Sequence, residues 1–362
     1  MFIVLSAIFF FLILRFVVSL FNFLSDPKLR RTAIHHQHLV SILIPARDEE
    51  DNIIPLLQSI VDQDYRDYEV IILDDGSSDH TYQRCVNFAA KHDNFRVIKG
   101  QPLPADWLGK NYACYQLAQQ ARGEYLLFLD ADEKVEPGLI NSALHRMQLR
   151  NLALLSLFTN QEMRTTGEQL VVPLMHYILL NLLPLQLVYL VKNQAVAAAS
   201  GQFMLFNADI YRTNQWHAQV RGKVVEDVEI MRAVKASGHN GEALLANNMI
   251  SCRMYENYGE AVQGFSKNFL AAFNYNVFAF IIYLLLLTGG PLIVIMTLNS
   301  NLIVFMCGLI LLTRIMISLL SGQNVLRNII LHPLQMLSLT AIGFLSVQQY
   351  LTKTTVWKGR KV

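Results

Sequence analysis

Charged residues are scarce in this chain, and the scarcity limits what kind of protein it can be. Asp, Glu, Lys and Arg supply 16% of the 362 residues, whereas hydrophobic residues supply 53%. So few charges are unusual for a purely soluble enzyme, although the length suffices for one sizeable α/β domain with extra segments. The net charge is only +2, and we expect no nucleic-acid partner.

Cysteine is also rare, and the sequence contains no internal repeat or low-complexity stretch. The four cysteines have no paired spacing: Cys85, Cys114, Cys252 and Cys307. They suggest neither a disulfide framework nor a zinc site. We expect reduced side chains that serve mostly in packing.

The apolar residues gather at the two ends of the chain. The segment from Phe2 to Leu24 carries one charge, Arg15, and is long enough to cross a hydrocarbon core of roughly 30 Å with some tilt. A cleaved signal peptide would need a basic start, a shorter apolar run and a small-residue cleavage site, which are missing here. We therefore predict an uncleaved anchor over residues 1–25. Basic residues after it place the next block in the cytoplasm: Lys28, Arg30 and Arg31.

Strand and helix patterns alternate after the anchor. Short apolar runs predict strands at residues 39–45, 69–73, 95–98, 125–129 and 151–158. Helices are expected from residue 53, at 79–91 with Asp79 as N-cap, and at 111–122. This alternation is typical of βαβ units, so we predict an α/β fold with a mostly parallel sheet.

Two groups of carboxylates stand where strands end. Residues 74–79 read Asp-Asp-Gly-Ser-Ser-Asp after one apolar run, and Asp130-Ala131-Asp132 follows another. Parallel sheets bind ligands beyond the carboxyl ends of their strands. Both groups are therefore expected at one site, although Asp74, Ser77, Ser78 and Asp79 singly also suit an ordinary turn.

These motifs together resemble family 2 glycosyltransferases with the GT-A fold, a nucleotide-diphospho-sugar transferase architecture. The resemblance rests on residues 41–49, 70–79 and 130–132, in that order and spacing, and extends over roughly residues 39–240. It implies a cytoplasmic catalytic domain over residues 38–275 with flanking transmembrane helices. The sequence is thus identified as that of a transferase acting on a nucleotide sugar, most naturally a UDP-sugar.

The resemblance also implies roles on the donor side. Asp132 would bind Mg²⁺ or Mn²⁺, Asp130 would reach the ribose or share the metal, and Asp75 would accept a hydrogen bond from the base. The nucleotide pocket would be completed by Pro45, Ala46, Arg47 and Glu49.

Residues 107–110 read Trp-Leu-Gly-Lys just before a predicted helix. A helix N-terminus attracts phosphate and a lysine adds positive charge. The segment resembles the W-x-G-K motif of membrane-anchored members that act on lipids, with Lys110 near the diphosphate. A solvated lysine on a loop is the alternative.

The acceptor side is expected farther along the chain. Residues 170–191 are apolar but contain Pro173 and Pro184, which favours an interfacial helix pair over a crossing; a core helix is the alternative. Gly201 and Gln202 resemble the family's acceptor-pocket residues. Glu226-Asp227 resembles the family's E-D pair, in which the aspartate is the catalytic base, here Asp227.

Processive polysaccharide synthases of the same family carry Q-x-x-R-W near residue 253, and this chain does not. Residues 264–268, Gly-Phe-Ser-Lys-Asn, look instead like the corresponding segment of transferases acting on carotenoid or hopanoid-type lipids. Arg253 and Lys267 are candidates for closing over the diphosphate, or for a basic rim that faces anionic lipid headgroups.

The C-terminal third predicts further membrane helices over residues 276–351 and a basic tail over 352–362. Three crossings there would place the tail outside, against the positive-inside rule, so we predict a multi-pass cell-membrane protein without a fixed count. The sequence predicts an inverting, metal-dependent glycosyltransferase with a lipid acceptor. The alternatives are a processive polysaccharide synthase and a lipid- or nucleotide-binding protein without activity.

Overall fold

The computed structural model describes residues 1–273, 275–352, 356–357 and 360–361. The chain divides into two compact units. The strand unit comprises Pro27–Asn160 and Leu185–Arg253, and the helical unit comprises Met1–Asp26, Gln161–Pro184 and Met254–Val362. Each unit is described by itself below. The predicted basic tail lies largely outside the described residues, and the predicted domain boundaries at 38 and 275 stay predictions.

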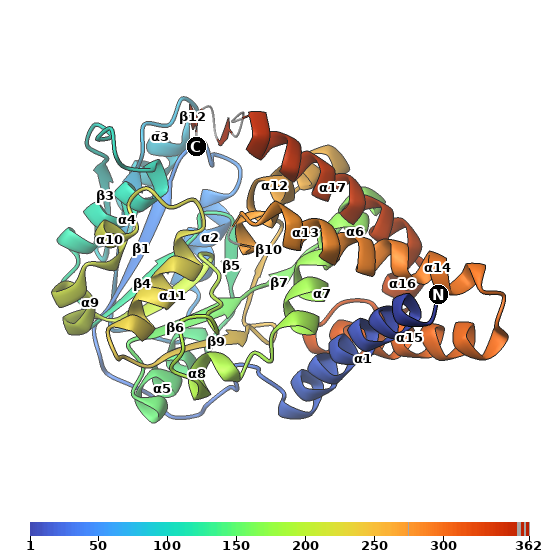
Figure 1. The fold of residues 1–362 in the computed structure, drawn as a ribbon. Coiled ribbons are helices and arrows are strands. Elements are labelled where there is room, and N and C mark those ends of the chain that lie inside the picture. The colour runs from blue at the N-terminus through green and yellow to red at the C-terminus, as the bar shows by residue number, and fades with distance from the viewer. Residues whose placement is uncertain (274, 353–355, 358–359, 362) are drawn as a thin grey trace. The chain divides into compact units, whose positions relative to one another are not determined.

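A seven-stranded sheet forms the core of the strand unit, in the order β3-β2-β1-β4-β8-β6-β9 (Figure 1). Its strands are β1 (Val40–Ala46), β2 (Tyr68–Asp74), β3 (Phe95–Lys99), β4 (Tyr125–Leu129), β6 (Leu154–Phe158), β8 (Phe203–Asn207) and β9 (Gly241–Leu245). The central strands β1, β2 and β4 are buried at every position except Pro45. Continuous apolar runs therefore form fully covered strands, as the sequence predicts.

The sheet is parallel in one half and mixed in the other. Strands β3, β2, β1 and β4 are parallel, whereas β8 runs antiparallel to both β4 and β6, and β6 is parallel to β9. The predicted mostly parallel sheet is confirmed, since every strand except β8 runs in the same direction. The chain reaches β8 after residues 161–184, which belong to the helical unit, and not through a βαβ crossover, so the rule that makes such connections parallel does not apply.

The helices of the strand unit are α2 (Ile53–Val61), α3 (Thr81–Ala89), α4 (Gly109–Gln120), α5 (Leu139–Arg150), α8 (Leu187–Leu190), α9 (Ala208–Asn214), α10 (Trp216–Gln219) and α11 (Glu226–Ala236). The predicted N-cap of α3 is wrong by one residue, because His80 holds that position. Asp79 instead accepts hydrogen bonds from the Thr81 and Glu50 amides. Its carboxylate joins two loops as well as the helix start.

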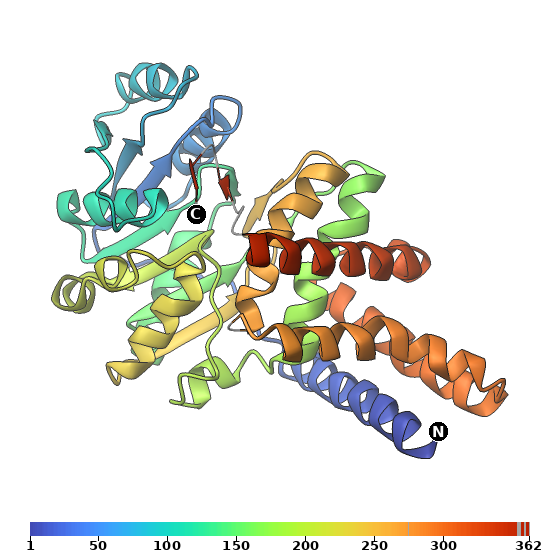
Figure 2. The ribbon, with the colours of Figure 1, turned by 45° about the horizontal axis from the view of Figure 1, so that its top comes forward.

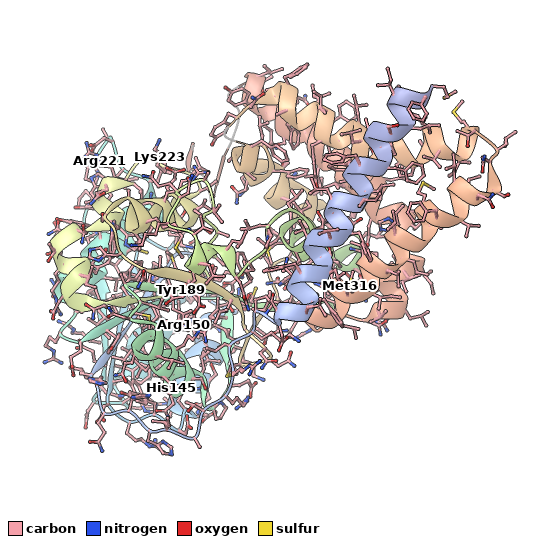
Figure 3. All side chains as sticks on the ribbon, turned by 60° about the horizontal axis from the view of Figure 1, so that its bottom comes forward. His145, Arg150, Tyr189, Arg221, Lys223 and Met316 are labelled. Atoms are coloured by element: carbon pink, nitrogen blue, oxygen red, sulfur yellow. The ribbon has the colours of Figure 1, made fainter. Side chains whose placement is uncertain are left out.

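A smaller sheet follows the second acidic group. Strand β5 (Glu133–Val135) pairs antiparallel with β10 (Ile250–Cys252), which brings Glu133 opposite Cys252. Strand β7 (Asn160–Gln161) lies where the chain leaves the strand unit. In the same unit, the Arg150 guanidinium lies 4.9 Å from the centre of the Tyr189 ring. Figure 3 labels both residues.

The helical unit is built from α1 (Phe2–Ser25), α6 (Thr166–Val171), α7 (Pro173–Leu182), α12 (Tyr258–Phe269), α13 (Val277–Leu284), α14 (Gly290–Met296), α15 (Ser300–Ser321), α16 (Val325–Ile330) and α17 (His332–Thr352) (Figure 2). Among the described residues, three helices are long and apolar enough to cross a membrane: Phe2–Ser25, Val277–Met296 and Ser300–Ser321. The second of these includes a π-helical turn, Leu285–Gly289, between α13 and α14. Helix α17, which forms the last part of the predicted membrane region 276–351, is not among them.

Helix α1 carries a polar stripe on its buried face. Arg15, Ser19 and Asn22 are spaced four and three residues apart, so they share one side of the helix. Asn22 donates hydrogen bonds to the carbonyls of Leu180 and Leu183, which belong to the C-terminal end of α7. The stripe therefore satisfies carbonyls that a helix end leaves without partners.

Candidate functional site

The ends of β1 and β2 are joined by backbone and side-chain contacts around Asp75. Its amide donates to the Ala46 carbonyl at 2.9 Å, and Arg47 Nη1 donates to the Asp75 carbonyl at 2.8 Å. Gly76 follows with φ of +69°, a conformation that glycine adopts without steric cost. The chain can therefore turn sharply while the Asp75 side chain stays at the strand ends.

The turn after β2 is tied to the turn after β1. The Asp48 amide donates to Ser77 Oγ, and the Ser78 amide and hydroxyl donate to the Asp48 carboxylate. Ser77 and Ser78 thus hold loop structure, in agreement with the turn interpretation. Their contacts fix the two strand ends against each other.

Lys110 lies at the centre of the second acidic group. Its Nζ is 2.7 Å from Asp130 Oδ1 and 2.9 Å from Oδ2, and 3.5 Å from Glu226 Oε1. The lysine is partly buried, which would lower its pKa, but Asp130 and Glu226 outweigh burial and hold the pKa well above its usual value. Lys110 therefore stays a cation and joins the end of β4 to the start of α11.

Asn111 keeps Lys110 in this position. The Asn111 side chain is buried, and its Nδ2 lies 3.0, 3.2 and 3.1 Å from the carbonyls of Val220, Arg221 and Lys223. These carbonyls belong to the turn that leads to Glu226, and Figure 3 labels Arg221 and Lys223. In the sequence, the signal for this role is the asparagine that directly follows Lys110, and no function was predicted for it.

The carboxylates after β4 carry more negative charge than Lys110 balances. Burial, Asp130 and Glu49 together raise the pKa of Asp132 to about 7. Burial and the same aspartates raise the pKa of Glu133 well above its usual value. Neither Glu133 carboxylate oxygen accepts a hydrogen bond from nitrogen or oxygen in the described part of the chain. Sequence reasoning missed Glu133, although it directly follows Asp132.

Asp227 is held by two backbone amides. Gly201 N–H donates to its Oδ2 at 3.0 Å and its neighbour Val228 N–H donates to Oδ1 at 2.7 Å. Burial and the adjacent Glu226 raise the pKa of Asp227 to about 7, against the smaller effect of the amides and Lys110. A carboxylate with such a pKa can accept a proton near neutral pH.

Gly201 leaves no free space beside this cluster. A methyl group on its Cα would lie 3.1 Å from Lys110 Nζ and 3.2 Å from Glu226 Oε1. Gln202, next in the chain, is buried, and its Nε2 donates to Cys252 Sγ while its Oε1 accepts from Thr159 Oγ1. The side-chain carboxamide of Gln202 therefore connects the start of β8 to Cys252 and Thr159.

The remaining predicted residues are distributed as follows. Pro45 and Ala46 end β1, and Glu49 accepts from Asn52 while its charge acts on Asp132. Arg253 directly follows β10 in the strand unit, whereas Lys267 belongs to α12 in the helical unit. One cluster in the strand unit thus contains Lys110, Asp130, Gly201, Glu226 and Asp227.

The residues at this site suit a divalent cation only if the substrate supplies further ligands. No group of three or more His, Cys, Asp or Glu side chains among the described residues could hold a metal by itself. The excess of carboxylates around Asp132 fits a cation that also takes ligands from substrate phosphates, which is how Mg²⁺ is usually bound.

Comparison with known proteins finds a family match for part of the chain. Residues 41–215 match the sequence profile of the family described as Glycosyl transferase family 2. The 4,4'-diaponeurosporenoate glycosyltransferase of Staphylococcus haemolyticus is 28% identical over 63% of this chain and 60% of its own length. The same-named protein of Staphylococcus aureus strain MRSA252 is 36% identical over 31% of this chain and 28% of its own. The chain's match thus spans less than two thirds of either relative.

A solved structure shares the fold. The mannosyltransferase PcManGT from Pyrobaculum calidifontis, in complex with GDP-Man and Mn²⁺, aligns with a TM-score of 0.56 and 13% sequence identity. The alignment covers 97% of this chain and all of that one. The predicted α/β fold of the GT-A type is confirmed.

Proposed function

We propose that this chain transfers a sugar from a nucleotide-diphosphate donor to a membrane lipid, with inversion at the anomeric carbon. Support comes from residues 41–215, which match the profile of glycosyltransferase family 2. The observation that carries the proposal is the position of Lys110 between Asp130 and Glu226. The expected donor side, at the strand ends, and the expected acceptor side, at the start of α11, meet at this lysine.

The donor would bind at the carboxyl ends of β1, β2 and β4. Asp75 would accept a hydrogen bond from the base, most naturally uracil, with Arg47 and Glu49 beside it. Asp130 would reach the ribose, and Lys110 would move from Asp130 towards the diphosphate. A cation there stabilises the charge that develops on the leaving diphosphate.

A metal ion would share this task. Asp132 and Asp130 would hold Mg²⁺ or Mn²⁺ together with diphosphate oxygens, and the ion would neutralise part of the leaving group's charge. The raised pKa of Asp132 supports this assignment, because burial first, and then the charges of Asp130 and Glu49, disfavour a carboxylate there without a nearby cation. The fold relative from Pyrobaculum is a complex with Mn²⁺.

Asp227 would act as the base. As an acceptor hydroxyl attacks the anomeric carbon, Asp227 would take its proton, and the bond to the diphosphate would break on the opposite face. The Gly201 and Val228 amides orient the carboxylate, and its pKa of about 7 matches a neutral operating pH.

The acceptor would be a lipid of the cell membrane, reached from the cytoplasmic side. Support comes from the three helices able to cross a membrane and from the relatives, whose name contains a carboxylate, diaponeurosporenoate. That name favours a lipid carboxyl as a second candidate acceptor group. A carboxylate needs no base, so Asp227 would then only orient it.

The test supplies purified full-length protein with Mg²⁺, a panel of sugar-labelled nucleotide sugars and a membrane lipid extract, followed by mass analysis of the labelled lipid. We expect one donor to label one lipid class. The matched variants are Asp227→Asn, which should lose labelling, and Asp209→Asn, an exposed acid that should keep it. Labelled long polymers would favour a processive synthase, and release of free sugar alone would refute transfer to a lipid.

A further inference from the structure

Helix α17 leaves an apolar stripe exposed along one side. Five exposed apolar residues follow one another at intervals of three, four, three and seven positions, so they share one face of the helix. We call them the α17 stripe: Leu334, Leu337, Ala341, Phe344 and Leu351. Leu337 is 66% exposed and Phe344 is 74% exposed, and Gln348 interrupts the stripe near its end. A helix surrounded by water usually shows the opposite pattern, with its polar residues outside.

The buried polar residues of α17 bond to neighbouring helices of the same unit. The Tyr258 hydroxyl donates to Ser338 Oγ at 3.3 Å, and the Leu270 amide, at the end of α12, donates to Ser346 Oγ at 3.1 Å. Gln335 Nε2 donates to a carbonyl of α6 at 2.8 Å. Residues 332–352 contain no Asp, Glu, Lys or Arg. These polar side chains, which lower the hydropathy of α17, therefore face protein, while the stripe does not.

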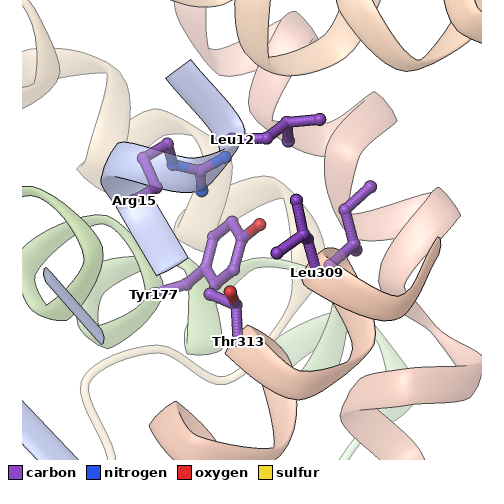
Figure 4. Close-up of a pocket in the computed structure, with 6 residues that line it drawn as sticks. Leu12, Arg15, Tyr177, Leu309 and Thr313 are labelled. Atoms are coloured by element: carbon purple, nitrogen blue, oxygen red, sulfur yellow. The ribbon is translucent and has the colours of Figure 1, made fainter. Parts of the chain in front are cut away.

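The helices able to cross a membrane show the same reversal. Arg15 of α1 and Arg314 of α15 are buried, and their guanidinium groups lie 5.0 and 4.4 Å from the centre of the Tyr177 ring. Figure 4 shows Arg15 and Tyr177 beside Leu12 and Leu309. Both helices leave mainly apolar side chains exposed. Polar groups inside and apolar groups outside are the pattern that lipid favours, so lipid also accounts for the exposed α17 stripe.

Helix α12 bears on how α17 meets the lipid. The hydrogen bonds between the two helices extend from Ser338 to Gln349, so α12 lies along most of α17. Glu260, Gln263 and Asn268, spread along α12, are exposed. If α17 crossed the membrane, these polar side chains would enter the hydrocarbon, which is costly. Figure 1 also shows α17 crossing the direction of α1 instead of running alongside it.

We propose that α17 lies in the plane of the membrane surface, with the α17 stripe among the acyl chains of one leaflet and α12 on the side that faces water. The apolar face of such a helix is typically buried about 5–10 Å into the boundary between headgroups and acyl chains. Helix α16 extends the surface, because Leu326 and Ile330 are exposed just before the stripe. The exposed Arg327 between them suits anionic headgroups.

Spin labels at matched positions test the orientation, in full-length protein without any nucleotide sugar. The background is Cys307→Ser, since the other three cysteines are buried. The α17 pair is Leu337→Cys and Phe344→Cys, and the control pair on α15 is Val304→Cys and Leu311→Cys, all at exposed positions. The members of each pair are seven residues apart, which is about 10 Å along a helix axis.

The measurement is the depth of each label in nanodiscs of phosphatidylcholine and phosphatidylglycerol, from relaxation by oxygen and by a water-soluble nickel complex. We expect both α17 labels at the same depth and more accessible to oxygen than to nickel, whereas the α15 labels should differ by most of their separation. A label at Gln263→Cys, exposed on α12, should be more accessible to nickel.

Three results would overturn the proposal. A depth difference within the α17 pair as large as that of the α15 pair would show that α17 crosses the membrane. Greater nickel than oxygen accessibility at both α17 positions would show that the stripe faces water. Protection from both reagents, with a label-to-label distance that disappears on dilution with unlabelled protein, would show that a second copy of the chain covers the stripe.

Discussion

At the scale of single residues, Asp227 combines the geometry and the pKa of a base. Its carboxylate is fixed by two amides, and burial with Glu226 raises its pKa to about 7. The unfolded-state value is about 4. Folding therefore favours the protonated form between about pH 4 and pH 7, so this group makes the protein less stable as the pH rises through that range.

The pH dependence of transfer follows from this pKa. With a hydroxyl acceptor, the rate should rise with pH, bend near pH 7 and stay level above it, because only the deprotonated base is active. Asp227→Asn should lower the rate by about 10² to 10⁴. It should also reduce the loss of stability between pH 4 and pH 7 by the contribution of Asp227, while that of Asp132 remains, and thermal melts would measure the difference. A flat profile with wild-type protein would indicate a carboxylate acceptor and contradict the base role.

Gly201 gives a second test at this scale. In Gly201→Ala the new methyl would lie 3.1 Å from Lys110 Nζ and 3.2 Å from Glu226 Oε1. Both atoms end flexible side chains, so the fold should tolerate the change while the cluster shifts. We expect transfer to fall about tenfold with little change in melting temperature. Gly222→Ala, whose methyl would meet only the Asp106 carbonyl at 3.6 Å, is the matched control and should remain fully active.

At the scale of elements, a buried carboxylate holds together the strands that carry the site. Glu69, in β2, accepts from Ser41 Oγ in β1 at 2.6 Å and from Arg122, just before β4, through its amide and guanidinium. Ser41 Oγ in turn accepts from the Gly123 amide. Burial alone would raise the pKa of Glu69, but these hydrogen bonds outweigh it and lower the pKa.

This network predicts a stability effect with a definite pH dependence. A lowered carboxyl pKa contributes stability above the unfolded-state value, and the contribution is lost as the pH falls through the folded-state value. Glu69→Gln should therefore lower the free energy of unfolding by about 1–3 kcal/mol at pH 7, and the difference from wild type should shrink below about pH 4. Urea unfolding measures both. Glu136→Gln, at a more exposed ion pair with Lys134, should change little, and an equal loss in both variants would contradict the assignment.

At the scale of the whole molecule, the number of candidate crossings bears on the topology. Within the described part of the chain three helices qualify, one near the N-terminus and two between residues 277 and 321. If each crosses once, the chain after Ser321 returns to the side on which residues 27–160 lie. The positive-inside rule then favours the cytoplasm for both Lys28 and Arg327, and the conflict raised by a fourth crossing disappears.

Cysteine labelling tests this topology. In a background with Cys307→Ser, the introduced cysteines would be Ser300→Cys, at the exposed start of α15, and Arg327→Cys, on α16. Asp209→Cys reports on the strand unit. In intact cells a membrane-impermeant maleimide should label only Ser300→Cys, and after permeabilisation it should label all of them. Labelling of Arg327→Cys in intact cells would show that the chain crosses differently.

Much of this protein follows from its sequence alone. Continuous apolar runs made β1, β2 and β4 recognisable as covered strands, and low charge marked the segments able to enter a membrane. The order and spacing of residues 41–49, 70–79 and 130–132 were sufficient to indicate a resemblance to family 2 glycosyltransferases. These features depend on local composition and spacing, which a sequence displays directly.

Only the tertiary structure decided which of these groups meet. Lys110 and Glu226 are more than a hundred positions apart, and Asn111 holds the connecting turn through three carbonyls that no sequence pattern reports. The reversed direction of β8, the burial of Glu133 and the position of Arg15 and Arg314 beside the Tyr177 ring likewise depend on long-range packing. A side chain's pKa and its unused hydrogen bonds are set by its neighbours in space, and those neighbours come from distant parts of the chain.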